Sequence, residues 1–259
     1  MMAGELFNRD ALRGRNVVVT GGAAGLGASI STALLEVGAR VCVVGRNKDN
    51  YQLLQEEVRS AGLPLDRLCF ARADLAEVEG AKQAVTEALR LLDDQVDALV
   101  NNAGIAELGP LESLAVDAWD RVMGVNVRAP FLLAQGLVPG MIERKKGKII
   151  NISSQAGTVA IQDHGAYCAS KSALDSLTRV MTLEWSKHNI QCNSLGPTVI
   201  MTDMGKKNWG GEAGSGLLSK TPLGRCYWCH QPAHCWCNLQ CQCSALPCSR
   251  QLAVPTLWR

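Results

Sequence analysis

The 259-residue sequence has little net charge and no apolar run long enough to cross a membrane. A formal charge of +2 is too small to indicate binding to nucleic acid or to a membrane surface. Residues 1–7 lack the basic-then-apolar order of a secretory signal. We therefore expect a cytoplasmic protein with one α/β domain and a small molecule as its partner.

Acidic residues, lysine and glycine are all missing from residues 226–259, which hold seven of the eleven cysteines. The other four, Cys42, Cys69, Cys168 and Cys192, stand singly in expected strands or beside a helix start, so reduced thiols are favoured over a disulfide scaffold. This change in composition divides the chain into a domain at 1–225 and an atypical tail at 226–259.

The tail allows two interpretations. Six of its residues could supply zinc ligands: Cys226, Cys229, His230, His234, Cys235 and Cys237. However, a second well-spaced cysteine pair across an ordinary loop is missing, so a metal site is not the favoured interpretation. We instead expect an unstructured or poorly packed tail, which a shifted reading of the coding message would explain.

Short apolar runs alternate with helix-period segments along residues 16–195. The runs are 16–20, 39–45, 68–73, 98–101, 148–153 and 191–195. The helical patterns begin near Leu26, Lys48, Glu77, Val116 and Tyr167. This alternation predicts a Rossmann-like, doubly wound parallel sheet, whose ligands bind at the carboxyl ends of the strands.

Three glycines, Gly21, Gly25 and Gly27, lie between the first expected strand and the first helix. Glycine lets the backbone turn tightly and approach a pyrophosphate at the positive end of the helix. At the end of the second strand, where a carboxylate would hold the ribose of NAD, Gly45 is followed by Arg46. A cation there favours NADP, although an ordinary solvated arginine remains the alternative.

Tyr167, Lys171 and Ser154 form a candidate proton-transfer site. Tyr167 and Lys171 are four residues apart and share a helix face, and Ser154 follows a buried strand. An ammonium near a phenol favours the phenolate, and a serine hydroxyl can stabilise a developing oxyanion. Such tyrosine and lysine pairs also occur by chance on solvated helices, so the surrounding motifs must decide.

Over residues 10 to about 225 the chain resembles the short-chain dehydrogenase/reductase family. The residues that carry the resemblance are Thr20, Gly21, Gly25, Gly27, Asp74, Leu75, Asn101, Asn102, Ala103, Gly104, Asn126, Ser154, Tyr167, Lys171, Pro197 and Thr202. It implies a cofactor site made by Gly21, Gly25, Leu26, Gly27, Arg46, Asp74, Leu75, Asn102, Ala103, Gly104, Tyr167, Lys171, Pro197, Ile200 and Thr202.

The same resemblance implies catalytic roles. Tyr167 would donate the proton, its pKa lowered by Lys171 and by the nicotinamide charge. Ser154 would polarise the carbonyl, and Asn126 would help to hold a water that links Lys171 to solvent. Asp74 and Asn102 have simpler interpretations as a helix cap and a turn residue, and Asn126 as a core residue.

Three further motifs are Ser153-Ser154-Gln155, His164-x2-Tyr167-Cys168 and the segment from Pro197 to Gly205 with Trp209. They resemble those of the subgroup that contains carbonyl reductases and L-xylulose reductase. Gln155, His164 and Trp209, with Ser154, would line the substrate pocket, although His164 could equally be a surface loop residue. The expected activity is NADP(H)-dependent reduction of a small carbonyl compound, such as L-xylulose or an α-dicarbonyl, without a metal.

The family pattern stops at Arg225, before the segment that would supply the last strand. The final strand is thus expected to be missing or replaced, which leaves a sheet edge open. The family implies a homo-oligomer, usually a tetramer, whereas the altered tail argues against one. A catalytically silent nucleotide-binding or regulatory protein is the alternative function.

Overall fold

The computed structural model describes residues 8–209 and 240–242. The described strands are β1 (Asn16–Thr20), β2 (Arg40–Gly45), β3 (Leu68–Arg72), β4 (Ala98–Asn101), β5 (Gly147–Ile152), β6 (Ile190–Gly196) and β7 (Gln240–Gln242). The α-helices are α2 (Gly25–Glu36), α3 (Lys48–Ser60), α4 (Val78–Leu91), α5 (Val116–Met123), α6 (Ala129–Glu143), α7 (Gly165–Trp185) and α8 (Asp203–Trp209).

The strands form one sheet in the order β3-β2-β1-β4-β5-β6-β7. The strands β1 to β6 are parallel to one another, which confirms the predicted doubly wound sheet. The strand order reverses between β1 and β4, and in such sheets the ligand crevice opens at this switch point. The six predicted strands agree with β1 to β6 to within one residue at each end.

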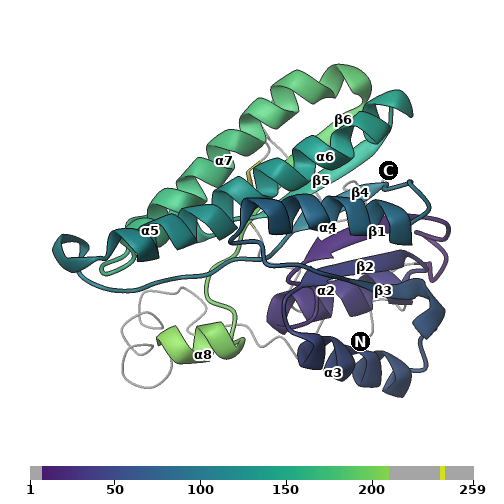
Figure 1. The fold of residues 1–259 in the computed structure, drawn as a ribbon, viewed down its shortest axis with the longest axis horizontal. Helices are drawn as coiled ribbons and strands as arrows, with labels where there is room; N and C mark the ends of the chain where they lie inside the picture. Colours follow the sequence, from purple (N-terminus) through teal and green to yellow (C-terminus); the bar gives the residue numbers. More distant parts are fainter. Residues whose placement is uncertain (1–7, 210–239, 243–259) are drawn as a thin grey trace.

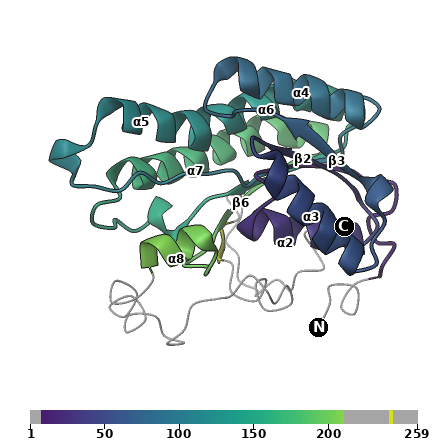
Figure 2. The same ribbon diagram turned by 60° about the horizontal axis from the view of Figure 1, so that its bottom comes forward.

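Helices cover both faces of the sheet (Figure 1). One face packs against α4, α6 and α7 through residues such as Leu99, Leu133 and Met181. The other packs against α2 and α3 through residues such as Val19 and Leu35. Figure 2 shows α2 and α3 on the side opposite α4 and α6. Because both faces are buried, the strands are almost continuously apolar.

The helix predicted near Val116 proves to be three consecutive segments. After α5, residues Gly124–Arg128 form a π-helical turn, η3, which leads directly into α6. A π-turn admits one extra residue into a helix, and such turns often occur at functional sites. Here it carries Asn126, which is fully buried.

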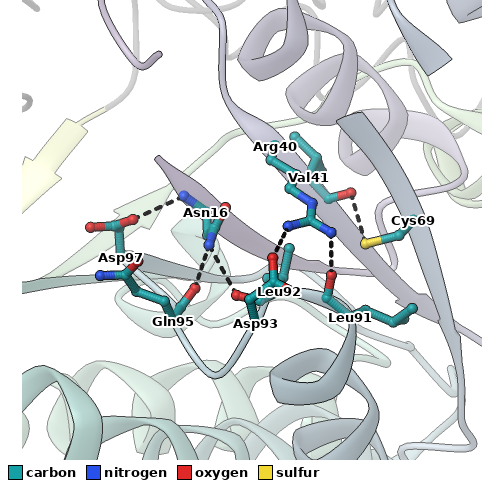
Figure 3. A network of polar contacts seen from close by, with 9 residues as sticks. All are labelled: Asn16, Arg40, Val41, Cys69, Leu91, Leu92, Asp93, Gln95 and Asp97. Atoms are coloured by element: carbon teal, nitrogen blue, oxygen red, sulfur yellow. Dashed lines mark hydrogen bonds and ion pairs between the residues drawn. The ribbon is translucent and has the colours of Figure 1, made fainter. Parts of the chain in front are cut away.

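The amino ends of the strands are fixed by polar contacts on the side opposite the crevice (Figure 3). The backbone N–H of Asn16 donates a hydrogen bond to the Asp97 carboxylate across 2.9 Å. Arg40 donates to the Leu91 carbonyl at 2.7 Å and pairs with Asp93 at 2.6 Å. These contacts hold the carboxyl end of α4 against β1 and β2.

The last described strand, β7, has three residues and runs antiparallel to β6. The predicted boundary between residues 225 and 226 lies outside the described residues, as do the candidate zinc ligands of the tail. In the described part of the chain, none of the helices is both long enough and apolar enough to span a bilayer.

Candidate active site

The loop between β1 and α2 has the backbone that its glycines allow. Gly21 and Gly25 have φ angles of +61° and +52°, in the left-handed region that favours glycine. A Cβ atom on Gly27 would lie 2.1 Å from the carbonyl oxygen of Gly21, so only glycine fits there. Ala24, which precedes α2, gives the helix no side-chain cap, and its first turn has no acidic residue. These features fit a nucleotide pyrophosphate at the helix start.

Asn102 fastens the end of β4 to this loop. Its amide nitrogen Nδ2 donates to the carbonyl oxygens of Thr20 at 3.0 Å and Gly21 at 3.3 Å. Its backbone N–H donates to the Thr20 hydroxyl at 3.0 Å. The side chain therefore joins the glycine loop to the end of β4 across the switch point. The sequence had also allowed a simpler role, in which Asn102 only completes a turn.

Lys171 is buried beneath the end of β5. Only 3% of the residue is exposed, and its Nζ donates a hydrogen bond to the carbonyl oxygen of Ile152 at 2.8 Å. Burial lowers the pKa of Lys171 to about 8, and the nearby Asp175 carboxylate partly opposes this shift. An amine with such a pKa can exchange a proton near neutral pH.

Tyr167 lies one helical turn before Lys171 on α7, and the Lys171 Nζ is 5.6 Å from the centre of its ring. Burial raises the pKa of Tyr167, a hydrogen bond from Ser154 lowers it, and Cys168 raises it slightly. The expected lowering by Lys171 is therefore not found in the protein alone. The reason is geometric, because the ammonium is directed at the Ile152 carbonyl.

The two serines after β5 have different environments. Ser153 is buried, and its hydroxyl donates to the backbone carbonyl of Lys171 at 3.4 Å. Ser154 lies on the cavity wall, and its hydroxyl oxygen accepts a hydrogen bond from the N–H of Ala156 at 3.2 Å. Both serines line the cavity, and the role of Ser154 toward a substrate oxygen stays a prediction from the sequence.

Asn126 uses its whole side chain to connect the loop after β4 with α7. Its Oδ1 accepts from the N–H of Ile105 at 2.9 Å, while Nδ2 donates to the Ile105 carbonyl at 2.9 Å. The same Nδ2 donates to the hydroxyl of Ser170 at 3.0 Å. A Cβ atom on Gly104 would lie 3.4 Å from both the Asn126 Oδ1 and the Lys171 Nζ. Asn126 thus positions the loop after β4, which lies next to the Lys171 ammonium.

A cavity of 360 Å³ joins the glycine loop to the Ser154, Tyr167 and Lys171 cluster. Fifteen predicted site residues line it: Gly21, Gly25, Leu26, Gly27, Asn102, Ala103, Gly104, Ser154, Gln155, His164, Tyr167, Lys171, Pro197, Ile200 and Thr202. Lining residues that the sequence did not indicate include Ala106, Ile161, Thr198, Val199, Asp203 and Asn208. Thr198, Val199 and Asp203 lie in the segment from Pro197 to Gly205, whereas Ala106, Ile161 and Asn208 have no motif or period that indicates them.

His164 is a buried wall residue, with 8% of it exposed, so the surface-loop alternative is wrong. Its ring meets that of Tyr167 edge to face, with 6.3 Å between the ring centres. Its Nδ1 lies 2.7 Å from the carbonyl oxygen of Gln162, which fixes the orientation of the imidazole. Gln155 stands near it on the wall, and its backbone N–H donates to the Pro197 carbonyl.

Four predicted site residues are not on this cavity wall. Arg46 and Asp74 lie at the ends of β2 and β3 and form an exposed ion pair of 3.4 Å. Leu75 is buried in the hydrophobic core, and Asn126 lies behind the wall. Asp74 also accepts from the N–H of Ala76 at 3.0 Å, ahead of α4, so it shapes a turn. Trp209 ends α8, and its side chain lies outside what the structure describes.

A glycine loop at the switch point of a parallel sheet, next to a serine, a tyrosine and a lysine, defines a nucleotide-dependent oxidoreductase. Residues 15–213 match the family model described as short chain dehydrogenase. The chain belongs to this family of oxidoreductases, as the sequence motifs indicated.

Known relatives share most of the chain. An L-xylulose reductase from Mus musculus is 38% identical over 83% of this chain and 84% of its own length. An NAD-dependent glycerol dehydrogenase from Listeria innocua is 35% identical over 84% of this chain and 83% of its own. A gluconate 5-dehydrogenase from Burkholderia cenocepacia, solved with NADP and tartrate, is 33% identical, with a TM-score of 0.77 over 86% of each chain.

Proposed function

We propose that the protein is an NADP(H)-dependent reductase of a small carbonyl substrate, either a sugar such as L-xylulose or an α-dicarbonyl. The observation that carries this proposal is the convergence of Ser154, Tyr167 and Lys171 on a cavity that continues to the glycine loop. The names of the relatives, which include L-xylulose reductase and glycerol dehydrogenase, support a sugar or polyol as the substrate.

The substrate end of the cavity has mixed polarity. Gln155, His164 and Asn208 can offer hydrogen bonds, while Ile161 and Val199 are apolar. A polyhydroxylated substrate needs several polar partners in a small site, and a short dicarbonyl needs fewer. The polar residues that line the cavity therefore favour a sugar over an α-dicarbonyl as the substrate.

In the proposed mechanism Ser154 donates a hydrogen bond to the substrate carbonyl oxygen and so polarises the carbonyl bond. When NADPH is bound at the glycine loop, it would supply the hydride for the carbonyl carbon. Tyr167 gives its phenolic proton to the same oxygen as negative charge develops there. Since burial raises the pKa of Tyr167, the phenol is protonated and ready to donate at neutral pH.

Lys171 has two proposed tasks. With a pKa of about 8, its amine can pass a proton onward after the Tyr167 phenol has donated its own. It would also bind the nicotinamide ribose. Asn126 positions the loop next to the ammonium through Ile105.

The preference for NADP(H) is supported by Arg46 at the end of β2, where Gly45 replaces the carboxylate that NAD would favour. The relative crystallised with NADP agrees with this preference, whereas the relative described as NAD-dependent favours the other cofactor.

The four described cysteines are free thiols, which supports a cytoplasmic location.

The direct test follows oxidation of NADPH and NADH with xylulose and with diacetyl, for the wild-type protein and for Tyr167→Phe. We expect faster oxidation of NADPH and a loss of about 10²–10⁴-fold in the variant. Tyr51→Phe is the matched control, because its hydroxyl bonds the Leu68 carbonyl away from the cavity. Equal rates for the wild-type protein and Tyr167→Phe would reject the assigned chemistry.

A catalytically silent nucleotide-binding protein is the second candidate. The observation behind it is the three-residue strand β7, the last in the sheet order, which pairs with β6 over a short length. Titration with NADPH, followed by nucleotide fluorescence, separates the two functions. Binding without turnover of any carbonyl tested would favour the silent protein, and turnover would exclude it.

A further inference from the structure

The carboxyl ends of β2 and β3 place two arginines next to each other. Arg72, the last residue of β3, is paired in register with Gly45, and Arg46 follows Gly45 directly. The side-chain Nε of Arg72 donates a hydrogen bond to the backbone carbonyl of Arg46 at 3.3 Å. A contact between side chain and backbone thus joins the two strand ends.

The direction of the Arg72 side chain follows from its neighbours. Ala71 and Ala73 are buried in the core cluster against α4 and α6. Because alternate residues of a strand point to opposite faces, Arg72 projects to the face that α3 covers. There it is exposed to solvent, at the end of the strand nearest the start of α3.

The charges of the two guanidinium groups are balanced differently. Arg46 has a carboxylate partner, Asp74, at 3.4 Å. Arg72 forms no ion pair with any residue among 8–209, and its hydrogen bond to Arg46 uses Nε alone. Its two terminal nitrogens can therefore donate hydrogen bonds to an acceptor that approaches from the solvent.

We propose that Arg72 is a second cation for the 2′-phosphate of NADP(H), and that it positions Arg46 through the carbonyl contact. A phosphate monoester carries nearly two negative charges at neutral pH, which one guanidinium already paired with Asp74 balances only in part. Two adjacent guanidinium groups can offer it parallel N–H donors. The inference rests on the proposed preference for NADP(H).

The test measures binding of two nucleotide fragments to the full chain by calorimetry. Adenosine 2′,5′-bisphosphate carries the extra phosphate, and 5′-AMP lacks it. We expect the wild-type protein to prefer the bisphosphate, and Arg72→Met to reduce that preference about tenfold with an unchanged affinity for 5′-AMP. Arg59→Met, at the far end of α3, removes one exposed arginine elsewhere and should leave both affinities unchanged.

Two further variants separate charge from positioning. Arg72→Lys keeps the charge but not the forked donors, and should retain part of the preference. Arg46→Met should lose most of it. A wild-type protein without preference would overturn the NADP(H) proposal and this inference together. A wild-type preference that survives Arg72→Met but not Arg46→Met would overturn this inference alone. An altered affinity of Arg72→Met for 5′-AMP would also overturn this inference, because Arg72 would then act on the general shape of the site.

Discussion

The ammonium of Lys171 donates a hydrogen bond to the carbonyl oxygen of Ile152 across 2.8 Å, which joins α7 to the last residue of β5. Ser153 and Ser154 directly follow the end of β5, and Tyr167 lies on α7. This contact therefore sets the distance between the two serines and Tyr167. The contact needs a buried cation, and burial of a cation costs free energy of folding. The site is therefore held together by a group that destabilises the fold.

This cost should be visible as a dependence of stability on pH. The pKa of Lys171 falls from 10.5 to about 8 on folding, so below about pH 8 the penalty is fully present. Between about pH 8 and pH 10 the folded protein holds fewer protons than the unfolded chain, and stability rises with pH. Two to three pKa units correspond to about 3 kcal/mol.

Lys171→Met removes this titration. Denaturant unfolding of the wild type and the variant from about pH 7 to pH 10 should show a wild-type gain that the variant lacks, up to about 3 kcal/mol. Lys187→Met, which removes an exposed lysine beyond α7, should follow the wild-type curve. Parallel curves for the wild type and Lys171→Met would show that the buried amine does not titrate in this range.

Gly27 is the position in the nucleotide loop with the least space. A Cβ atom there would lie 2.1 Å from the Gly21 oxygen, a backbone atom that cannot move without opening the loop. Gly27→Ala should therefore weaken NADPH binding strongly and lower the unfolding free energy by about 1–3 kcal/mol. Titration of the nucleotide and denaturant unfolding measure the two effects.

Gly109→Ala is the control for this substitution. A Cβ atom on Gly109 meets nothing within 4 Å, and its φ angle is not in the left-handed region. The variant should bind NADPH with wild-type affinity. If Gly27→Ala also bound NADPH normally, the loop would be more adaptable than its geometry indicates.

Much of this architecture could be predicted from the sequence because the signals are local. Runs such as Val17, Val18 and Val19 predict a buried parallel strand, and all three are fully buried. Their alternation with helix periods determines the sheet class, and the glycines between β1 and α2 determine where the nucleotide loop lies. Tyr167 and Lys171 share one helix, so their proximity is also local.

Relationships between distant segments could not be predicted. Arg46 and Asp74 are 28 residues apart, and their ion pair depends on the register of β2 with β3. The carbonyl of Ile152 carries no sequence signal as the acceptor for Lys171. The residue types at Gly124–Arg128 are mostly weak helix formers, and they do not indicate that the turn they form is a π-turn.

Cys69 should react faster than Cys42 and Cys192 in the native protein. A hydrogen bond from Cys42 lowers the pKa of Cys69 against the effect of burial, with help from Arg40. The Sγ lies 3.6 Å from the Val41 carbonyl (Figure 3) and is only partly buried. By contrast, burial raises the pKa of Cys192 to about 12, and the pKa of Cys42 is raised as well.

Alkylation with iodoacetamide near pH 8, followed by peptide mass spectrometry, tests this order. Cys69 should be modified before Cys42 and Cys192, and Arg40→Met should slow its modification. Peptide-level detection keeps the tail cysteines separate. Modification of Cys42 ahead of Cys69 would contradict the order that the burial and the pKa shifts of the two thiols predict.

Asn126 gives the most direct test of how the site is positioned. Asn126→Ala leaves the N–H and the carbonyl of Ile105 without their side-chain partners, and should lower the unfolding free energy by about 2–4 kcal/mol.

Asn126→Asp keeps the acceptor but places a carboxylate where Nδ2 donated. Burial should raise the pKa of that new carboxyl group, so its destabilisation is largest at neutral pH and disappears as the pH falls below the unfolded-state value near 4. Asn50→Ala, a substitution on α3, should change stability by less than about 0.5 kcal/mol. Denaturant unfolding at two pH values distinguishes these results. A pH-independent loss in Asn126→Asp would mean that the loop shifts and exposes the new carboxylate to water.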